Sequence, residues 1–325
     1  MNRKSHGAAC ALAFVAGVSL AGAAIGAEHY PVRPVRIVVG FPPGGAADIV
    51  ARIIGNKLVD IWGQNIVVDN RPGAGSTLGA EIAARAVPDG YTLMVVSSSY
   101  AASAGLYRKL PYDPIAAFAP ISLVASTPQI LLANPSVPVK SLNDVLSLAK
   151  ASPGKYNYGS AGNGSTTHLA GELLCSMAGV KMTHVPYKGG ALALTDTIAG
   201  HIQYMFFTVP PALPHVKAGK VKAIAVTSLK RSPSLPDVQA AAEVVPGYEA
   251  TNWYAVLAPA GVPKPVVGRI VSGVREALKD SAVKSAISNA GADPLGGPPE
   301  ELAKYLRSEI AKWSRVIKEA GVPLQ

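Results

Sequence analysis

Two glycine-rich segments hold the residues whose types and spacing could do chemistry. In the first, residues 41–48, a β-rich run ends, two glycines free the backbone and a helical pattern begins. Uncapped N–H groups and the positive end of a helix dipole at such a turn favour a carboxylate. An ordinary strand-to-helix turn explains this segment equally well. Its candidate ligand contacts are Phe41, Pro43, Gly44, Gly45, Ala46 and Asp48.

The second segment, residues 156–168, repeats the pattern of strand, small-residue loop and helix start. Its hydroxyl groups can donate hydrogen bonds, and its glycines let the backbone approach a ligand closely. The two loops, one from each half of the chain, together predict a pincer that closes on an anion from both sides. The candidate contacts in the second loop are Ser160, Ala161, Gly162, Gly164, Ser165, Thr166 and His168.

Other chemistry for these loops is less well supported. A phosphate-binding P-loop needs a lysine after its last glycine, and neither loop has a dinucleotide fingerprint. His168 could act as a base for Ser160 or Ser165 in a secreted hydrolase, but a nucleophile elbow and an acid partner are missing. Orienting the loop or donating to a ligand is the other role open to His168. The histidines lack metal-ligand spacing, so no metal and no cofactor are expected.

The N-terminus carries the pattern of a secretory signal peptide. Two basic residues precede an uncharged run of small and apolar residues, 8–25, and small residues continue to Ala27. This predicts a signal peptide over residues 1–27, cleaved near Ala27 or at Ala23, and a periplasmic location. A membrane anchor is disfavoured because glycines dilute the run below the roughly 20 strongly apolar residues that a span needs.

Composition narrows the partners. The 325 residues suggest about two domains, and 30 basic against 20 acidic residues suit an anionic ligand. Nucleic acid is not expected, because Lys and Arg are scattered without a basic block or interleaved aromatic residues. Cys10 lies in the signal peptide, in a flank that lacks the leucine of a lipid-modified cysteine, and Cys175 is left alone. Neither a lipid anchor nor an intramolecular disulfide is expected.

Apolar β-rich runs alternate with helical patterns along the rest of the chain, which predicts an α/β fold of two similar units with a largely parallel sheet. The last helices are expected to pack back on the first unit. The predicted domains are residues 28–128 plus 251–325, and residues 129–250, with a ligand cleft between them. Strands are expected at 35–39, 66–68, 91–96, 120–123, 130–133, 156–158, 181–185, 202–207, 221–226 and 253–257, and helices at 46–58, 78–86, 142–150, 166–177, 191–199, 265–278, 281–289 and 299–319.

Ordered sequence blocks carry a family resemblance over nearly the whole mature chain. They include PPGG at 42–45, DNRPGAG at 69–75, PDGYTL at 88–93, HVPYKG at 184–189 and RSPSLPDV at 231–238. The chain resembles the substrate-binding proteins of tripartite tricarboxylate transporters, the Bug or TctC-type family. A monomer that is not an enzyme is expected, and the resemblance implies a type II periplasmic-binding-protein fold. It also implies carboxylate capture for the membrane subunits of such a transporter, with signalling to a membrane sensor as the alternative.

Further contacts follow from that resemblance. Ser97 and Ser98 would add hydroxyls after a strand, while Lys188 and Gly189 would line the second domain's side of the cleft. A solvated Lys188 is as compatible with the sequence as a direct charge pair with the ligand. Asp48 could recognise a ligand amine, or it could cap the helix that begins there.

One departure from the family pattern concerns the strand that ends in Phe207 and Thr208. Family members commonly carry an aspartate where this chain has Phe207. A phenyl ring facing the cleft would favour an amine-free carboxylate with apolar or aromatic bulk, such as terephthalate. Repacking of a domain wall by Phe207 is the equally weighted alternative.

Overall fold

The computed structural model describes residues 29–233 and 235–325. The predicted signal peptide, residues 1–27, and Cys10 within it lie outside the described residues. In the described part of the chain, no helix is both long and apolar enough to cross a membrane.

Within the described residues, a six-stranded sheet forms one end of the molecule, with the strand order β11-β4-β10-β3-β1-β2. Its strands alternate their apolar side chains between two faces: Ile37 and Val39 enter one core cluster, whereas Val38 enters another. The strands are β1 (Val35–Val39), β2 (Ile66–Asn70), β3 (Thr92–Ser97), β4 (Phe118–Thr127), β10 (Asn252–Pro259) and β11 (Asp293–Pro294).

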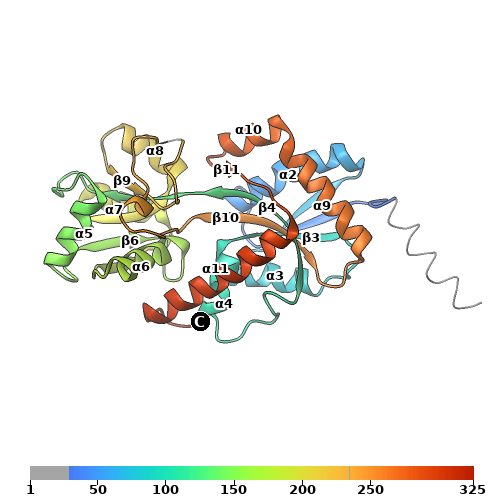
Figure 1. Cartoon of the computed structure of the whole chain (residues 1–325), viewed down its shortest axis with the longest axis horizontal. Helices are drawn as coiled ribbons and strands as arrows, with labels where there is room; N and C mark the ends of the chain where they lie inside the picture. Colours follow the sequence, from blue (N-terminus) through green and yellow to red (C-terminus); the bar gives the residue numbers. More distant parts are fainter. Residues whose placement is uncertain (1–28, 234) are drawn as a thin grey trace, which may run out of the picture.

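Helices cover both faces of this sheet (Figure 1). One face packs against α2 (Ala46–Trp62), α9 (Lys264–Lys279) and α10 (Ser281–Asn289), and buries an apolar cluster that includes Ile54 and Ile270. The other face packs against α3 (Thr77–Ala84), α4 (Ser98–Leu106) and α11 (Pro299–Glu319), with the short helix η1 (Ala74–Ser76) before α3.

A five-stranded sheet, again counted in the described part, forms the other end, with the order β7-β6-β8-β5-β9. Tyr204 and Phe206 face one core cluster, while Met205 and Phe207 face a second one that α7 and α8 cover. The strands are β5 (Gln129–Ala133), β6 (Asn157–Ser160), β7 (Thr183–Pro186), β8 (Tyr204–Thr208) and β9 (Lys222–Val226), and the helices are α5 (Leu142–Ala151), α6 (Thr166–Ala178), α7 (Gly190–Ala199), α8 (Val209–Lys217) and the short η2 (Ala241–Glu243).

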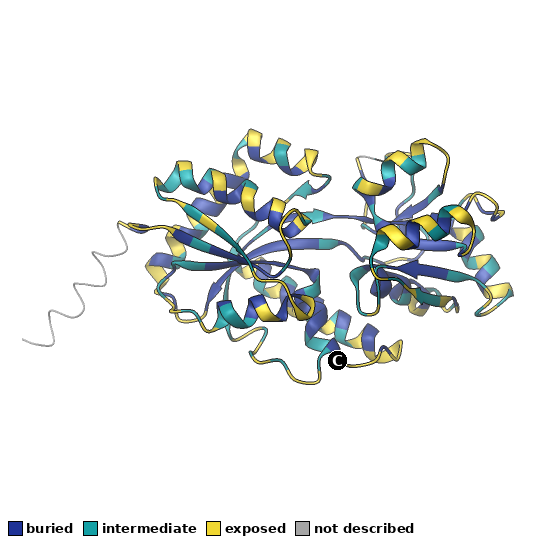
Figure 2. Ribbon diagram, turned by 180° about the vertical axis from the view of Figure 1, so that it is seen from behind, coloured by how far each residue is buried: buried dark blue, intermediate teal, exposed yellow. Residues whose placement is uncertain are grey.

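The chain passes between the two sheets along β4 into β5 and returns along β10, and both crossings are visible at the centre of Figure 1. Thr227 ties the crossings together. Its hydroxyl accepts from the Gln129 N–H at 2.9 Å and lies 3.0 Å from the Ala250 carbonyl oxygen. Figure 2 shows that both crossing strands are buried, while exposed residues lie on the outer helix faces.

The predicted order of strands and helices is confirmed, and α10 and α11 begin and end at the expected residues. Two α-helices were not predicted: α4 is made of small residues with little amphipathic pattern, and α8 contains three prolines. The short helices η1 and η2 and the two-residue strand β11 were not predicted either. The expectation of largely parallel sheets is wrong, because the crossing strands run against their neighbours. β10 is antiparallel to β3 and β4, and β5 is antiparallel to β8 and β9.

Candidate functional site

A groove lies where the two sheets face each other, and it consists of two adjoining pockets of about 440 and 340 Å³. Phe41, Ser97 and Asn252 line both pockets, which makes the groove continuous. The first pocket is otherwise lined by Pro42, Pro43, Gly44, Gly45, Ala46, Ala47 and Tyr254. The second is otherwise lined by Gly75, Ser99, Leu106, Tyr107, Asn163, Gly164, Ser165, Thr166 and Gln325.

The loop between β1 and α2, residues 41–45, is held from behind by a buried carboxylate. Gly44 has a left-handed φ of 79°, and its N–H donates to Asp48 Oδ2 at 2.9 Å. Arg52 and Asn70 also donate to Asp48, each at 2.9 Å, and Asn70 donates to the Phe41 carbonyl. Burial opposes ionisation, but these hydrogen bonds outweigh it and lower the pKa of Asp48 to about 2. Asp48 therefore supports the loop and does not line the groove.

The start of α2 presents unused donors to the first pocket. Its N-cap is Gly45, which has no side chain to bond the first turn. In the described part of the chain, the N–H groups of Ala46 and Ala47 have no protein acceptor, and both residues line the pocket. These donors and the helix dipole make this end of the groove a favourable place for an anion.

The start of α4 faces the same groove, and Asn252 and Tyr254, which sequence analysis missed, complete this wall. Ser97 and Ser99 line the second pocket with their hydroxyls 2.9 Å apart. Ser98 lies behind them and donates to Asn252 Oδ1, and Asn252 in turn donates to the Tyr254 hydroxyl at 2.8 Å. Asn252 is the first residue of the crossing strand β10. A polar residue at the start of a predicted crossing strand was the feature of the sequence that could have indicated this contact.

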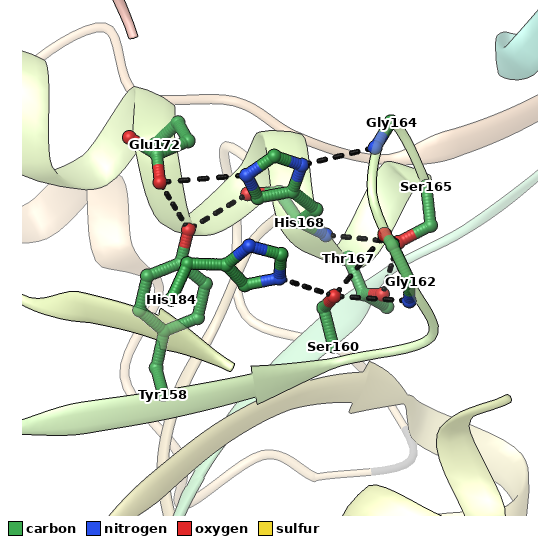
Figure 3. A network of polar contacts seen from close by, with 9 residues as sticks. All are labelled: Tyr158, Ser160, Gly162, Gly164, Ser165, Thr167, His168, Glu172 and His184. Atoms are coloured by element: carbon green, nitrogen blue, oxygen red, sulfur yellow. Dashed lines mark hydrogen bonds and ion pairs between the residues drawn. The ribbon is translucent and has the colours of Figure 1, made fainter. Parts of the chain in front are cut away.

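The loop between β6 and α6, residues 160–165, uses most of its own donors internally (Figure 3). The N–H groups of Ala161, Gly162 and Gly164 donate to Thr167, Ser160 and His168 respectively. The expected use of these three N–H groups for ligand binding is therefore not available in this conformation. Among the described residues, the backbone N–H groups of Asn163, Thr166 and Thr167 have no protein acceptor, and Asn163 and Thr166 line the groove.

His168 is buried and lies behind the second loop. Its Nδ1 accepts from the Gly164 N–H at 3.0 Å, and its Nε2 lies 3.5 Å from Glu172 Oε1. The hydrolase alternative requires His168 to contact a serine hydroxyl through its ring. The imidazole that contacts Ser160 is instead His184, at 2.6 Å, and Ser160 is fully buried and lines neither pocket.

The predicted contacts fall into three groups. Those lining the groove are Phe41, Pro43, Gly44, Gly45, Ala46, Ser97, Gly164, Ser165 and Thr166. Those lying behind its walls are Asp48, Ser98, Ser160, Ala161, Gly162 and His168. Those lying outside both pockets are Lys188, Gly189, Phe207 and Thr208.

Phe207 packs in the core cluster of the second sheet that α7 and α8 cover, which also contains Ile130 and Leu194. Its ring lies so close to Gly190 that a Cβ added there would approach Phe207 Cε2 to 2.5 Å. This position fits the alternative in which Phe207 repacks a domain wall. Aromatic surface in the groove comes instead from Phe41, Tyr107 and Tyr254.

The side chains that line the groove are polar or apolar. Among residues 29–233 and 235–325, no Lys, Arg, Asp or Glu side chain lines either pocket, and no group of three or more His, Cys, Asp or Glu residues is placed to hold a metal ion. The groups that the groove offers to a ligand are therefore backbone N–H groups, hydroxyls and an amide.

Comparison with known proteins identifies the family. Residues 50–322 match the TctC model, described as the tripartite tricarboxylate transporter family receptor. Protein BugT of Bordetella pertussis is 34% identical over 315 residues, which cover 96% of each chain. The solved structure of R. palustris Rpa4515 with adipate has a TM-score of 0.77 and 36% identity, covering 91% of this chain and 100% of that one.

MatC (Rpa3494) from Rhodopseudomonas palustris, solved with bound malate, has a TM-score of 0.71 and 35% identity, and the match covers 89% of this chain and 100% of MatC. The two-sheet architecture of this chain is that of the periplasmic binding proteins in these comparisons. The chain belongs to the TctC family of tripartite tricarboxylate transporter receptors and has their α/β, type II periplasmic-binding-protein fold.

Proposed function

We propose that this chain captures a small amine-free dicarboxylate in the groove and delivers it to the membrane subunits of a tripartite tricarboxylate transporter. One observation carries the proposal: helices from both sheets begin at the same groove. α2 and α4 begin there from the first sheet and α6 from the second. A dicarboxylate can satisfy both sides at once, because each carboxylate meets a helix N-terminus.

The lining of the groove, as far as the structure describes it, argues against an amine on the ligand. An ammonium group entering it would lose water and find no Asp or Glu side chain among the lining residues described above. The carboxylates would bind through N–H groups and hydroxyls rather than through ion pairs. Among the ligands of relatives, adipate and malate both carry two carboxylates and no amine, which supports this class.

Aromatic dicarboxylates belong to the proposed class. Phe41 lines both pockets, while Tyr254 and Tyr107 each line one, so a ring such as that of terephthalate would have apolar surface to pack against. The predicted wall at Phe207 is not needed for this, and its role at the ligand remains a prediction.

The proposal includes export and hinge closure. Cleavage of residues 1–27 and action as a monomer remain predictions, and the periplasmic relatives support the periplasmic location. The predicted domain division is supported by the two separate sheets, one built from strands between residues 35–127 and 252–294 and the other from strands within 129–226. Closure would bend the crossings that Thr227 ties together.

Ligands that differ only by an amine test whether the chain binds amine-free dicarboxylates. We expect glutarate, adipate, malate or terephthalate to raise the melting temperature of the mature protein, because a ligand that binds only the native state stabilises it. Glutamate differs from glutarate by its amine alone and should give a much smaller shift. Stronger stabilisation by glutamate would contradict the amine-free class, and no shift with any carboxylate would contradict carboxylate binding.

A proline substitution tests the donors of α2. Ala46→Pro removes one unused N–H at the first helical position, where proline is tolerated, and Gly45 already has the extended backbone that must precede proline. We expect the Kd of the stabilising dicarboxylate to rise about tenfold with little change in melting temperature. Ser281→Pro makes the same change at the start of α10, away from the groove, and should leave the Kd unchanged.

A further inference from the structure

A buried polar cluster lies directly behind the second groove loop, and its members line neither of the groove pockets (Figure 3). It consists of Tyr158 and Ser160 on β6, His184 on β7, and His168 and Glu172 on α6, and is called the histidine cluster below. Three elements that are adjacent in the fold thus bring two imidazoles into contact. Their rings stack with centroids 3.7 Å apart and planes 12° from parallel.

The contacts of His168 define the tautomer of its neutral ring. Nδ1 accepts a hydrogen bond from the Gly164 N–H at 3.0 Å, so Nδ1 carries no proton. Nε2 faces the Glu172 carboxylate at 3.5 Å and therefore holds the proton of the neutral ring. Doubly protonated His168 would point a second N–H at the Gly164 N–H, and that hydrogen bond would be lost.

His184 stabilises the neutral form of the pair. Its Nε2 lies 2.6 Å from Ser160 Oγ, and its ring also packs against Tyr158 with centroids 5.1 Å apart. Burial and the adjacent His168 lower the pKa of His184 to about 4. Two charged rings at stacking distance would repel each other, so the stack disfavours charge on both rings at once, and the Gly164 hydrogen bond requires a neutral His168.

Gly164 connects this cluster to the groove. It lines the second pocket with a left-handed φ of 71°, and a Cβ added to it would lie 2.6 Å from Leu106 Cδ2 on α4. The residue therefore touches the first sheet's side of the groove. Loss of its hydrogen bond to His168 would move both the second pocket's wall and this contact across the groove.

We propose that His168 and His184 are positioning residues, which hold the second groove loop in its binding conformation as a neutral stacked pair and release it when His168 takes up a proton. The other titratable groups around the pair are Glu172 and Cys175 on α6, Tyr158 on β6 and Tyr248 on the segment before β10. Glu172 also lines a separate pocket of about 430 Å³ between α6, the segment before β7 and the end of α11, which gives protons a route that does not pass through the groove.

This inference rests on the proposed function for its effect on ligand affinity, but its first test needs no ligand. Hydrogen exchange of the Gly164 amide would be measured in the ligand-free protein at about pH 7.5 and about pH 5, corrected for intrinsic exchange. In His168→Leu, which lacks the acceptor, we expect protection to fall about five- to tenfold. His168→Asn places an acceptor near the Nδ1 position that does not titrate, and should recover most of the protection at both values of pH.

Affinity for adipate gives the second readout, at the same two values of pH. The wild-type Kd should rise about five- to tenfold on acidification, whereas the Kd of His168→Asn should change little. His201→Asn is the matched control, because His201 is exposed, pairs with Asp196 and lines neither groove pocket. Its affinity and pH dependence should be those of the wild type.

Each result decides between the alternatives. The positioning role would be overturned if the Gly164 amide were equally protected in the wild type and in His168→Leu. It would also be overturned if acidification reduced this protection equally in the wild type and in His168→Asn. If His168→Leu does not fold, the comparison of the wild type with His168→Asn decides alone. Altered protection without binding of any carboxylate would support the positioning role and contradict the proposed function instead.

Discussion

The two groove loops share one local design but are held by different chemistry. In each loop, a glycine with a left-handed φ donates its N–H to a side chain four residues later, at the start of the following helix. The acceptor is the Asp48 carboxylate behind the first loop and the His168 imidazole behind the second. A carboxylate keeps accepting until it is protonated near its lowered pKa of about 2, whereas an imidazole stops accepting when it becomes charged.

The loops also differ in how many donors they leave for a ligand. Gly45 leaves the first turn of α2 without a side-chain cap, so the N–H groups of Ala46 and Ala47 face the groove. In the second loop, Ser165 caps α6 by accepting from the His168 N–H. We therefore expect the first loop to be the stronger anion site and the less sensitive to pH, and the second loop to be the more adjustable side of the groove.

Removal of Asp48 should give the largest effect on stability. Asp48→Ala deletes the acceptor for Gly44, Arg52 and Asn70, and we expect the free energy of unfolding to fall by about 3 kcal/mol in urea titrations. Asp48→Asn keeps one acceptor oxygen and should lose about half as much. An Asp48→Ala variant as stable as the wild type would show that the first loop does not depend on this carboxylate.

Alanine at the two donor glycines compares the loops directly. Both positions have a left-handed φ, so each substitution adds backbone strain of about 1 kcal/mol. A Cβ at Gly44 meets nothing within 4 Å, whereas one at Gly164 lies 2.6 Å from Leu106. We expect a loss of about 1 kcal/mol for Gly44→Ala and about 2 kcal/mol for Gly164→Ala in the same titrations. Equal losses would mean that the Leu106 side chain moves aside without a cost in free energy.

Local sequence patterns predicted the loops and most elements, because a strand end, a glycine pair and a helix start are adjacent in the chain. The residues that complete the groove are distant in sequence. Asn252 bonds Ser98 across 154 positions, and only the return of β10 between β3 and β4 brings the two together. The mixed direction of the sheets depends on the same crossing and has no local signal.

Side-chain roles were harder to predict than positions. Asp48 and His168 were expected as possible ligand contacts, but both side chains turn back to support their own loops. His184 was part of a recognised sequence block without a role, since its contact with His168 requires β6, β7 and α6 to be packed together. Phe207 sits on one of two strand faces, and the sequence alone did not indicate which face meets the ligand.

The pH dependence of stability gives the smallest expected effect and separates the two loops. The pKa of His184 falls from its ordinary value of 6.5 to about 4 on folding. The unfolded chain therefore binds a proton first as the pH falls, and stability is lost between about pH 6.5 and about pH 4. His184→Gln lacks this group, so its free energy of unfolding should fall less over that range, by about 1 kcal/mol after allowance for partial exposure. Asp48 adds to the pH dependence of stability only below about pH 4, because above that pH its carboxyl group is ionised in both the folded and the unfolded chain. Identical slopes for the wild type and His184→Gln would remove the histidine pair as the acid-sensitive difference between the loops.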